Sequence, residues 1–411
     1  MPVGPSNSRR GRVRVFATLR SPPKAPRRAR PSEETICASQ FLHGETQQAT
    51  EPARGRRGSA TPSVASSTVT TKPSTAERNI DNVVLGDILF RAWYPSCYAP
   101  DIVGKEVVEG KKEQMLERLY VCKHCFKYSK ELMSWMAHVR ACDRRLNGPL
   151  AMIPGRKVYT HGDGVWSVWE VDGEVDTVGF IFPPLSLKSR TWRLTRSQLY
   201  CQNLSLFAKL FLDNKSVFFD VTGFLYFLLT HTDLQSGAQQ VVGFFSKEKM
   251  SWDNNNLACI LIFPPWQRKG LGSILISVSY EISRREEIMG GPEKPISDLG
   301  KRGYLRFWSS EIARYLLEFE DSENKGKGTV TLEQISKDTW ICVEDCLCAL
   351  RDMGVAISAG KGRGDTQRVS VDKEMIRAWA TNGRMRLEPT INPSGFIEGY
   401  GCKAVDAETQ V

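Results

Sequence analysis

Four residues of metal-binding type occur in this sequence at a spacing that few folds can accommodate. Cys122 and Cys125 are separated by two residues, twelve residues follow, and then come His138 and Cys142, four positions apart. Zinc prefers four thiolate or imidazole ligands in a tetrahedron. Residues four apart share one face of a helix, so the second pair can meet a first pair held on a tight turn. The spacing therefore predicts a closed, structural zinc site within residues 119–143.

The role of this finger is open between two readings. Fingers that read DNA usually occur in tandem, with base-contacting side chains on the helix. This chain has one finger, followed by a long globular region, which favours a structural brace over a DNA reader. Phe126, Leu132 and Trp135, which lie between the two ligand pairs, are expected to form a small core.

Charge and composition exclude several classes of protein. The net charge is +10, but nine of the Lys and Arg residues fall within residues 1–32, which contain no acidic residue. Residues 1–78 therefore read as a disordered basic tail, suited to nuclear import or weak DNA contact, with a transit peptide as the alternative. A hydrophobic content of 41% excludes a wholly disordered chain, and no apolar run approaches the ~18 residues of a membrane span. Eleven cysteines, an odd number, with no secretory signal indicate a reducing compartment.

Periodicity predicts the remaining elements only coarsely. Strands are expected at 83–90, 165–171 and 216–221, whereas 224–230 could be either a strand or a helix. A hairpin is expected from 241–245 and 257–263, with helices at 202–212 and 273–287. The last 85 residues resemble a helix–turn–helix with a two-stranded wing at 355–357 and 369–371.

A glycine-containing loop joins the second hairpin strand to the following helix. Residues 267–272 place Gly270 and Gly272 where backbone N–H groups and the helix dipole can hold a pyrophosphate, and Arg268 and Lys269 add positive charge. The loop is neither the dinucleotide-binding pattern nor a nucleotide P-loop. The remaining candidate ligand for this loop is a phosphate-bearing carrier such as coenzyme A.

Many motifs in order now resemble one family, the MYST histone acetyltransferases, and most closely its fungal something-about-silencing branch. They are the finger and the segments 201–204, 243–249, 259–261, 264–265, 267–272, 279–281, 292–295 and 297–304. The resemblance implies a mixed α/β fold, with a GNAT-like acetyltransferase sheet flanked by the zinc finger and a winged-helix-like end. The implied division is a tail at 1–78, a finger region at 79–145, a core at 146–325 with a loop insertion at 176–198, a winged-helix-like domain at 326–400 and a tail at 401–411.

The same resemblance assigns roles to individual residues. Glu293 is the expected general base, and Lys215 matches the lysine that the family acetylates on itself. Cys259 matches an active-site cysteine, which is either a covalent acyl carrier or a small residue beside the thioester; direct transfer is the preferred reading. The expected acetyl-CoA contacts are Ile260, Leu261, Ile262, Gln267, Arg268, Lys269, Gly270, Leu271, Gly272, Ser273 and Ser297.

The implied function is a nuclear, zinc-containing lysine acetyltransferase that acts on histone tails, with histone H4 the expected target, as part of a chromatin-modifying complex. Two alternatives stay open: a non-catalytic chromatin or DNA-binding protein that kept the fold, and an acetyltransferase of non-histone proteins.

Overall fold

The computed structural model describes residues 12–17, 78–103, 115–146, 153–162, 164–175, 196–319, 329–361, 367–383 and 385–402. Most of the predicted basic tail, most of the insertion and the end of the C-terminal tail lie outside the described residues. Helices and strands are both abundant, so the mixed α/β class is confirmed.

The central sheet has five antiparallel strands in the order β10-β9-β8-β7-β6. Their bounds are β6 (Arg156–His161), β7 (Trp166–Asp172), β8 (Phe224–Thr232), β9 (Gln239–Glu248) and β10 (Cys259–Ile262). The predicted hairpin is confirmed as β9 and β10, and the undecided apolar run is strand β8. The strand predicted at 216–221 is absent from that segment, which is described throughout. Strand β8 occupies the position between β7 and β9, so the segment just before it has no strand to pair with at that position.

Successive residues of the central strands pack into two different cores, because side chains alternate across a sheet. Tyr226 lies in one buried cluster and Phe227 in another. Their partners on β9 stack on them ring to ring, with centroids 6.0 Å apart for Tyr226–Phe244 and 4.5 Å for Phe227–Phe245. An apolar run buried on both faces explains why periodicity alone could not identify β8.

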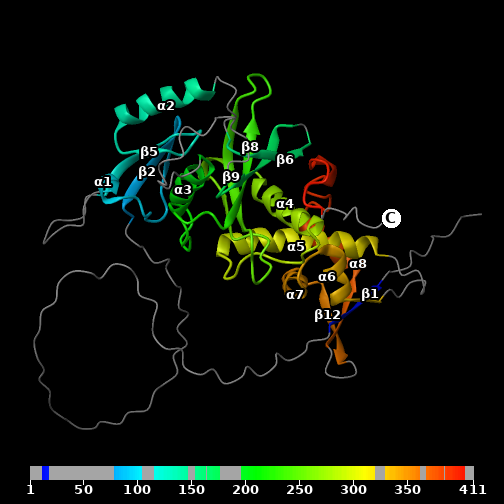
Figure 1. The fold of residues 1–411 in the computed structure, drawn as a ribbon. Helices are drawn as coiled ribbons and strands as arrows, with labels where there is room; N and C mark the ends of the chain where they lie inside the picture. Colours follow the sequence, from blue (N-terminus) through cyan, green and yellow to red (C-terminus); the bar gives the residue numbers. More distant parts are fainter. Residues whose placement is uncertain are drawn as a thin grey trace, which may run out of the picture. The chain divides into compact units, whose positions relative to one another are not determined.

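Helices cover both faces of this sheet (Figure 1). Helix α3 (Arg196–Lys209) packs on the Tyr226 face, and α4 (Leu271–Arg285) packs on the Phe227 face. Helix α3 begins at Arg196, so the last three residues of the predicted insertion are helical. The helix between residues 271 and 285 agrees with the predicted span to within two residues.

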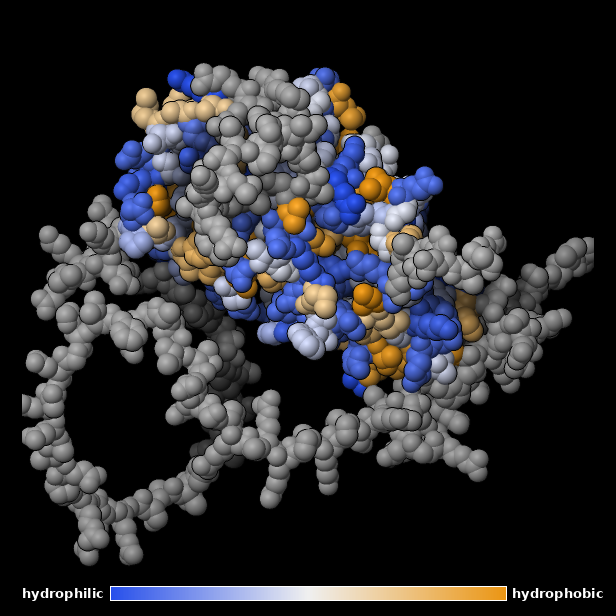
Figure 2. All heavy atoms as spheres, viewed as in Figure 1, coloured by the Kyte–Doolittle hydropathy of each residue, from blue (hydrophilic) through white to orange (hydrophobic). Residues whose placement is uncertain are grey.

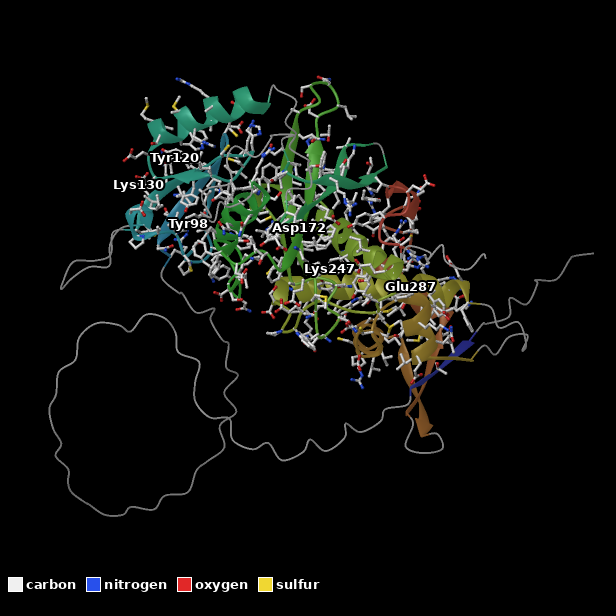
Figure 3. All side chains as sticks on the ribbon, in the orientation of Figure 1. Tyr98, Tyr120, Lys130, Asp172, Lys247 and Glu287 are labelled. Carbon is white, nitrogen blue, oxygen red and sulfur yellow. The ribbon has the colours of Figure 1, made fainter. Side chains whose placement is uncertain are left out.

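The finger region forms a second sheet of order β3-β2-β4-β5. Its strands are β2 (Ile80–Leu85), β3 (Ile88–Arg91), β4 (Leu116–Val121) and β5 (Tyr128–Ser129), with helices α1 (Pro100–Val103) and α2 (Leu132–Leu146). The single strand predicted at 83–90 is a hairpin, because Gly86 adopts a φ of 63° and reverses the chain. Tyr98, Tyr120 and Lys130, labelled in Figure 3, belong to this region.

The C-terminal region contains the predicted helix–turn–helix and wing. It comprises α5 (Asp298–Glu318), β11 (Thr329–Thr331), α6 (Leu332–Thr339), α7 (Val343–Asp352), β12 (Ala356–Lys361), β13 (Gln367–Asp372) and α8 (Lys373–Asn382). The short 3-10 helices η1 (Pro264–Trp266) and η2 (Pro393–Gly395) complete the list of elements. Buried side chains of α5 to α8 form a third cluster.

One segment of the predicted disordered tail is ordered instead. Strand β1 (Arg12–Ala17) lies between β11 and β13 in a sheet of order β11-β1-β13-β12. Its sequence places Val13 and Val15 in alternation with arginines, a pattern typical of a strand. Averaging composition over 78 residues concealed this short signal.

Large apolar side chains that reach the surface are scattered. On the face that Figure 2 shows, they form small patches separated by polar residues. No helix in the described ranges combines the length and the apolar character that crossing a membrane requires.

Candidate active site and metal centre

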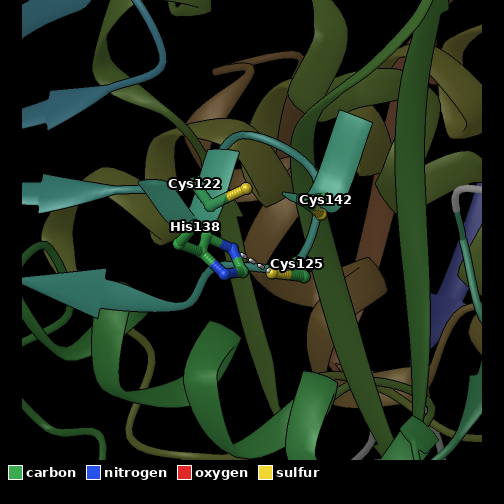
Figure 4. Close-up of side chains that lie close together, drawn as sticks. All are labelled: Cys122, Cys125, His138 and Cys142. Carbon is green, nitrogen blue, oxygen red and sulfur yellow. Dashed lines mark hydrogen bonds between the residues drawn. The ribbon is translucent and has the colours of Figure 1, made fainter. Parts of the chain in front are cut away.

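The four predicted metal-binding side chains converge at one point (Figure 4). Cys122 follows β4, Cys125 lies on the adjoining turn, and α2 carries both His138 and Cys142. Their ligand atoms all lie within 4.8 Å of one another, and Cys125 Sγ is 3.3 Å from His138 Nε2. Hydrogen bonding by the Cys125 and Cys142 thiols lowers the pKa of Cys122, which favours a thiolate. Three sulfurs and one imidazole in this space form a donor set that suits zinc.

The turn between the first two cysteines is anchored by an aromatic residue. The Phe126 amide donates to the Cys122 carbonyl oxygen, and its φ is 57°. The Phe126 ring is fully buried and packs against Tyr200, Phe207 and Phe263, with centroids 5.5, 5.5 and 5.9 Å away. The turn therefore locks onto α3 and onto the end of β10.

The small core predicted within the finger is only partly correct. Leu132 is 45% exposed, and Phe126 packs outside the finger; Trp135 contacts the Tyr120 ring at 5.6 Å. The finger shares its core with the neighbouring sheet and α3, because a unit this small has little apolar surface of its own to bury.

The candidate base, Glu293, lies beside the strand that carries Cys259. Its amide donates to the Leu257 carbonyl oxygen at 2.8 Å, next to a parallel bridge between Leu257 and Pro292. Asn256 donates to the Gly291 carbonyl oxygen at 2.9 Å. Gly290 passes so close to Asn254 that a Cβ there would be 1.8 Å from its carbonyl oxygen. The main chain leading to Glu293 is thus fixed in place.

The Glu293 side chain is exposed, yet enough protein surrounds its carboxyl group to change its chemistry. Partial burial raises the pKa of Glu293, the charge of Glu248 raises it further, and the positive charge of Lys215 opposes both. A carboxylate with a raised pKa is a better proton acceptor near neutral pH than an ordinary glutamate.

Lys215 is buried, with only 6% of its surface exposed. Burial lowers the pKa of its ammonium group, whereas negative charge on Cys259, Cys201 and Glu293 would raise it. Among the described residues, no hydrogen bond or ion pair to Lys215 Nζ is found. Glu293, Lys215 and Cys259 are therefore close enough to influence one another electrostatically. The sequence alone could not show that this lysine is buried.

The strand that carries Cys259 lies at the edge of the central sheet. Ile260, Leu261 and Ile262 pair with β9 on one side, and no other strand of the described chain pairs with β10. The Cys259 amide donates to Ser246 Oγ at 3.3 Å. An edge strand offers unpaired backbone groups to an extended ligand.

The loop after β10 presents backbone N–H groups and positive charge. Gly270 is the N-cap of α4 with a φ of 79°, and as a glycine it supplies no side-chain cap to this helix. Arg268, Lys269 and Gly270 are exposed, whereas Leu271 is buried and Gly272 and Ser273 are partly buried. Gln267 is committed to the fold, because its side chain donates to the Ile262 carbonyl oxygen at 2.8 Å. An uncapped helix terminus beside two cations suits a phosphate.

Ser297 has a structural contact that the sequence did not reveal. It is the N-cap of α5, and its hydroxyl accepts a hydrogen bond from the Gly300 amide at 3.2 Å. A serine followed by an acidic residue at the start of a helix is a recognisable capping signal. The structure also pairs Lys294 with Asp345, which lies 51 residues later, and no motif signalled this contact.

Further ion pairs lie at the end of the central sheet that contains Asp172 and Lys247. Asp172 and Lys247 are both in register with Leu225, and Figure 3 labels both. Lys247 pairs with Glu286 of the residues after α4. Lys249 pairs with Asp172 at 2.7 Å. These contacts join the end of β9 and the residues that follow it to β7 and to the end of α4.

Sequence comparisons with known proteins point to one family. Residues 191–395 match the MOZ/SAS family, and residues 77–142 match the MYST family zinc finger domain. Over 288 residues the chain is 34% identical to histone acetyltransferase SAS2 of Saccharomyces cerevisiae, which covers 67% of this chain and 75% of that protein. The chain belongs to the MOZ/SAS family. The predicted resemblance is confirmed.

Other MOZ/SAS relatives are larger. Histone acetyltransferase MOF of Drosophila melanogaster is 37% identical over 67% of this chain, which spans 27% of that protein. The Tip60 homolog of Caenorhabditis elegans is 34% identical over 67% of this chain, which spans 51% of that protein. The chain thus spans between about a quarter and a half of these two proteins. Their identities are as high as that of SAS2, so the fungal branch stays a prediction.

Proposed function

We propose that this chain is a protein lysine acetyltransferase that transfers the acetyl group of acetyl-CoA to a histone tail. The observation that carries the proposal is the position of Glu293. Its main chain is bonded to the segment before Cys259, and its carboxyl group is electrostatically coupled to the buried Lys215. The names of the matched MOZ/SAS relatives support the same activity.

Proton removal is the step that requires a base. A free lysine has a pKa of about 10.4, so only about one in 2,500 is neutral at pH 7. Glu293 accepts the ammonium proton, and the neutral amine attacks the thioester carbonyl carbon. The new C–N bond forms as the C–S bond breaks. The coenzyme leaves as a thiolate, which takes up the extra proton of the new amide nitrogen. The raised pKa of Glu293 suits proton transfer near neutral pH.

The cofactor would lie along two features of the structure. Its pantetheine arm would follow the open edge at Ile260, Leu261 and Ile262. Its pyrophosphate would bind the uncapped start of α4, where Arg268 and Lys269 are exposed. The proposed pyrophosphate site also includes Gly270, Gly272 and Ser273. Gln267 and Leu271 contribute indirectly, because they hold the loop in its conformation.

Direct transfer is the proposed route, with Cys259 as a small residue beside the thioester. A covalent route would need a reactive thiolate at that position. Lys215 is the proposed site of self-acetylation, because it is buried near the proposed base and its pKa is lowered, which increases its neutral fraction.

The metal centre is proposed to hold a structural zinc ion on Cys122, Cys125, His138 and Cys142. All four ligands come from the protein, so no position remains for a reacting water. The finger and the C-terminal helices are proposed to brace the central sheet, and the domain boundaries expected from the sequence stay part of the proposal.

The finer assignments are part of the proposal. Histone H4 is the expected target, a chromatin-modifying complex the expected setting, and the nucleus the expected location. The basic residues 9–30 give the chain a weak affinity for DNA phosphates.

The proposal is tested with the full chain, acetyl-CoA and a histone H4 tail peptide, followed by mass spectrometry. Wild-type protein and Glu388→Gln, which changes an exposed loop glutamate, should acetylate the peptide, and Glu293→Gln should lose at least about two orders of magnitude in rate. Transfer to other proteins but not to histones would favour a different substrate. No transfer by the wild-type protein would favour a non-catalytic chromatin protein.

A further inference from the structure

We propose that Asp345, on helix α7 of the C-terminal region, is a positioning residue that holds the loop carrying Glu293 in place. The inference rests on the proposed function, because it concerns the loop that carries the proposed base. Asp345 lies 52 positions after Glu293 in the sequence, on a helix of the C-terminal region.

The carboxylate of Asp345 touches the loop on both sides of Glu293. Its Oδ1 accepts a hydrogen bond from Lys294 Nζ at 3.2 Å. Its Oδ2 lies so close to Gly291 that a Cβ there would be 3.1 Å away. One carboxyl group thus contacts the residue after the base and the residue two positions before it.

The Asp345 side chain is more deeply buried than the side chains of an ordinary surface ion pair. Its side chain is 7% exposed, whereas that of Lys294 is 58% exposed. Asp345 Oδ2 is buried and has no hydrogen-bond partner among the residues that the structure describes. A buried carboxylate is costly to keep in a fold unless its contacts serve a purpose. The contact that it makes here is with the loop of the proposed base.

The two sides of the loop are held differently. Up to Glu293, backbone hydrogen bonds with Asn256 and Leu257 fix the chain. Downstream, Ser297 begins α5 as its N-cap. Between these anchors, Ile296 packs against the C-terminal cluster, and the Lys294–Asp345 contact is the polar side-chain tie, so its loss should let the Glu293 carboxyl group move.

Other charged and titratable groups surround Asp345. They are Lys294 and Cys342 at its carboxylate, Glu344 beside it on α7, and the buried hydroxyl groups of Tyr304 and Tyr280 from α5 and α4. Tyr280 accepts a hydrogen bond from Trp308 Nε1 at 2.7 Å, whereas the Tyr304 hydroxyl has no partner within the described structure. Lys294 is the cation in this set, so its charge is the one that Asp345 balances.

The test compares three single variants of the full chain in steady-state acetylation of the histone H4 tail peptide. Asp345→Asn and Lys294→Gln should each lower kcat by about 10- to 100-fold, the range expected for a misplaced catalytic group. The KM for acetyl-CoA should stay within about twofold of the wild type, because the proposed cofactor loop lies elsewhere. Glu344→Gln, a neighbouring exposed acid on the same helix, should behave as the wild type.

A double variant separates positioning from general destabilisation. Asp345→Asn with Lys294→Gln places two amides where the charges were, so a hydrogen bond can form again. Its kcat should exceed that of Asp345→Asn alone, since the two changes are coupled. Lys294 is largely exposed, so its variant tests the tie even if Asp345→Asn folds poorly.

The outcomes distinguish this inference from the proposed function. An active wild-type protein with unchanged kcat in Lys294→Gln would overturn the positioning role and leave the acetyltransferase assignment intact. A parallel loss of kcat and of acetyl-CoA affinity in every variant, including Glu344→Gln, would also overturn it. An inactive wild-type protein would instead overturn the proposed function on which the inference rests.

Discussion

Replacement of Phe126 by alanine should sharply weaken the fold, because this ring joins the finger to the central core. The ring is fully buried and contacts three other aromatic rings at centroid distances of 5.5 to 5.9 Å. Phenylalanine-to-alanine changes at such sites cost about 3–5 kcal/mol. The positive φ at this position strains both residues alike, so it does not offset the loss.

A loss of this size is a large part of the total stability. Folded domains are stable by about 5–15 kcal/mol. A loss of about 3–5 kcal/mol would lower the folding equilibrium constant roughly 10²- to 10⁴-fold. Urea unfolding followed by tryptophan fluorescence measures it as a lower midpoint. Phe219→Ala is the matched control, because its ring is 57% exposed and the same change there should cost well under about 1 kcal/mol.

The assay also reports whether the finger is part of the cooperative unit. Phe263, which follows β10, is one of the contacts of Phe126, so the finger and the proposed cofactor strand should unfold together. Equal midpoints for Phe126→Ala and Phe219→Ala would refute the reasoning. A separate early transition, confined to the finger, would show that the two regions do not share a core.

Three further predictions concern the proposed sites. Removing the metal with a chelator, or changing Cys142→Ala, should lower the unfolding midpoint, measured by the same urea titration; an unchanged midpoint would argue against structural zinc. Lys215→Met removes a positive charge that lowers the pKa of Glu293, so the acidic limb of the pH–rate profile should move to higher pH. Lys215→Arg keeps the charge and should leave the acidic limb of the pH–rate profile unchanged. A shift of that limb in both variants would exclude the charge as the cause. Changing both Arg268 and Lys269 to glutamine should weaken acetyl-CoA binding by at least about tenfold in calorimetry, since each phosphate contact contributes roughly 1 kcal/mol or more. Undiminished affinity would place the pyrophosphate elsewhere.

The sequence identified the parts of the site whose chemistry fixes residue type and spacing together. Zinc requires a small set of ligands, and two pairs at fixed intervals leave little freedom, so the cluster at Cys122 and His138 was predictable. A glycine turn between a strand and a helix is similarly constrained, and the loop at Gly270 was found for that reason.

Contacts between distant segments were not predictable from one sequence. Asp345 meets Lys294 only because the C-terminal helices pack beneath the loop, and an aspartate on a helix usually faces solvent. Lys215 gave no sign of burial, because a lysine in a polar turn reads as a surface residue. Leu132 was expected in a core of the finger, but the finger is too small to build one by itself. Strand β1 was not predicted, because it lies within a tail of biased composition.

In the proposed mechanism a single carboxyl group acts as the base, and the pH dependence of one chemical step tests this role most directly. Single-turnover acetyl transfer should be measured against pH for the wild type and for Glu293→Gln. The wild-type rate should rise with pH through one ionisation above the ordinary range of a glutamate and then level off, because burial raises the pKa of Glu293 and only its deprotonated form accepts a proton. The Glu293→Gln profile should be far lower and should rise steadily with pH, as more of the substrate lysine becomes neutral. Superimposable profiles for the two proteins would contradict the account.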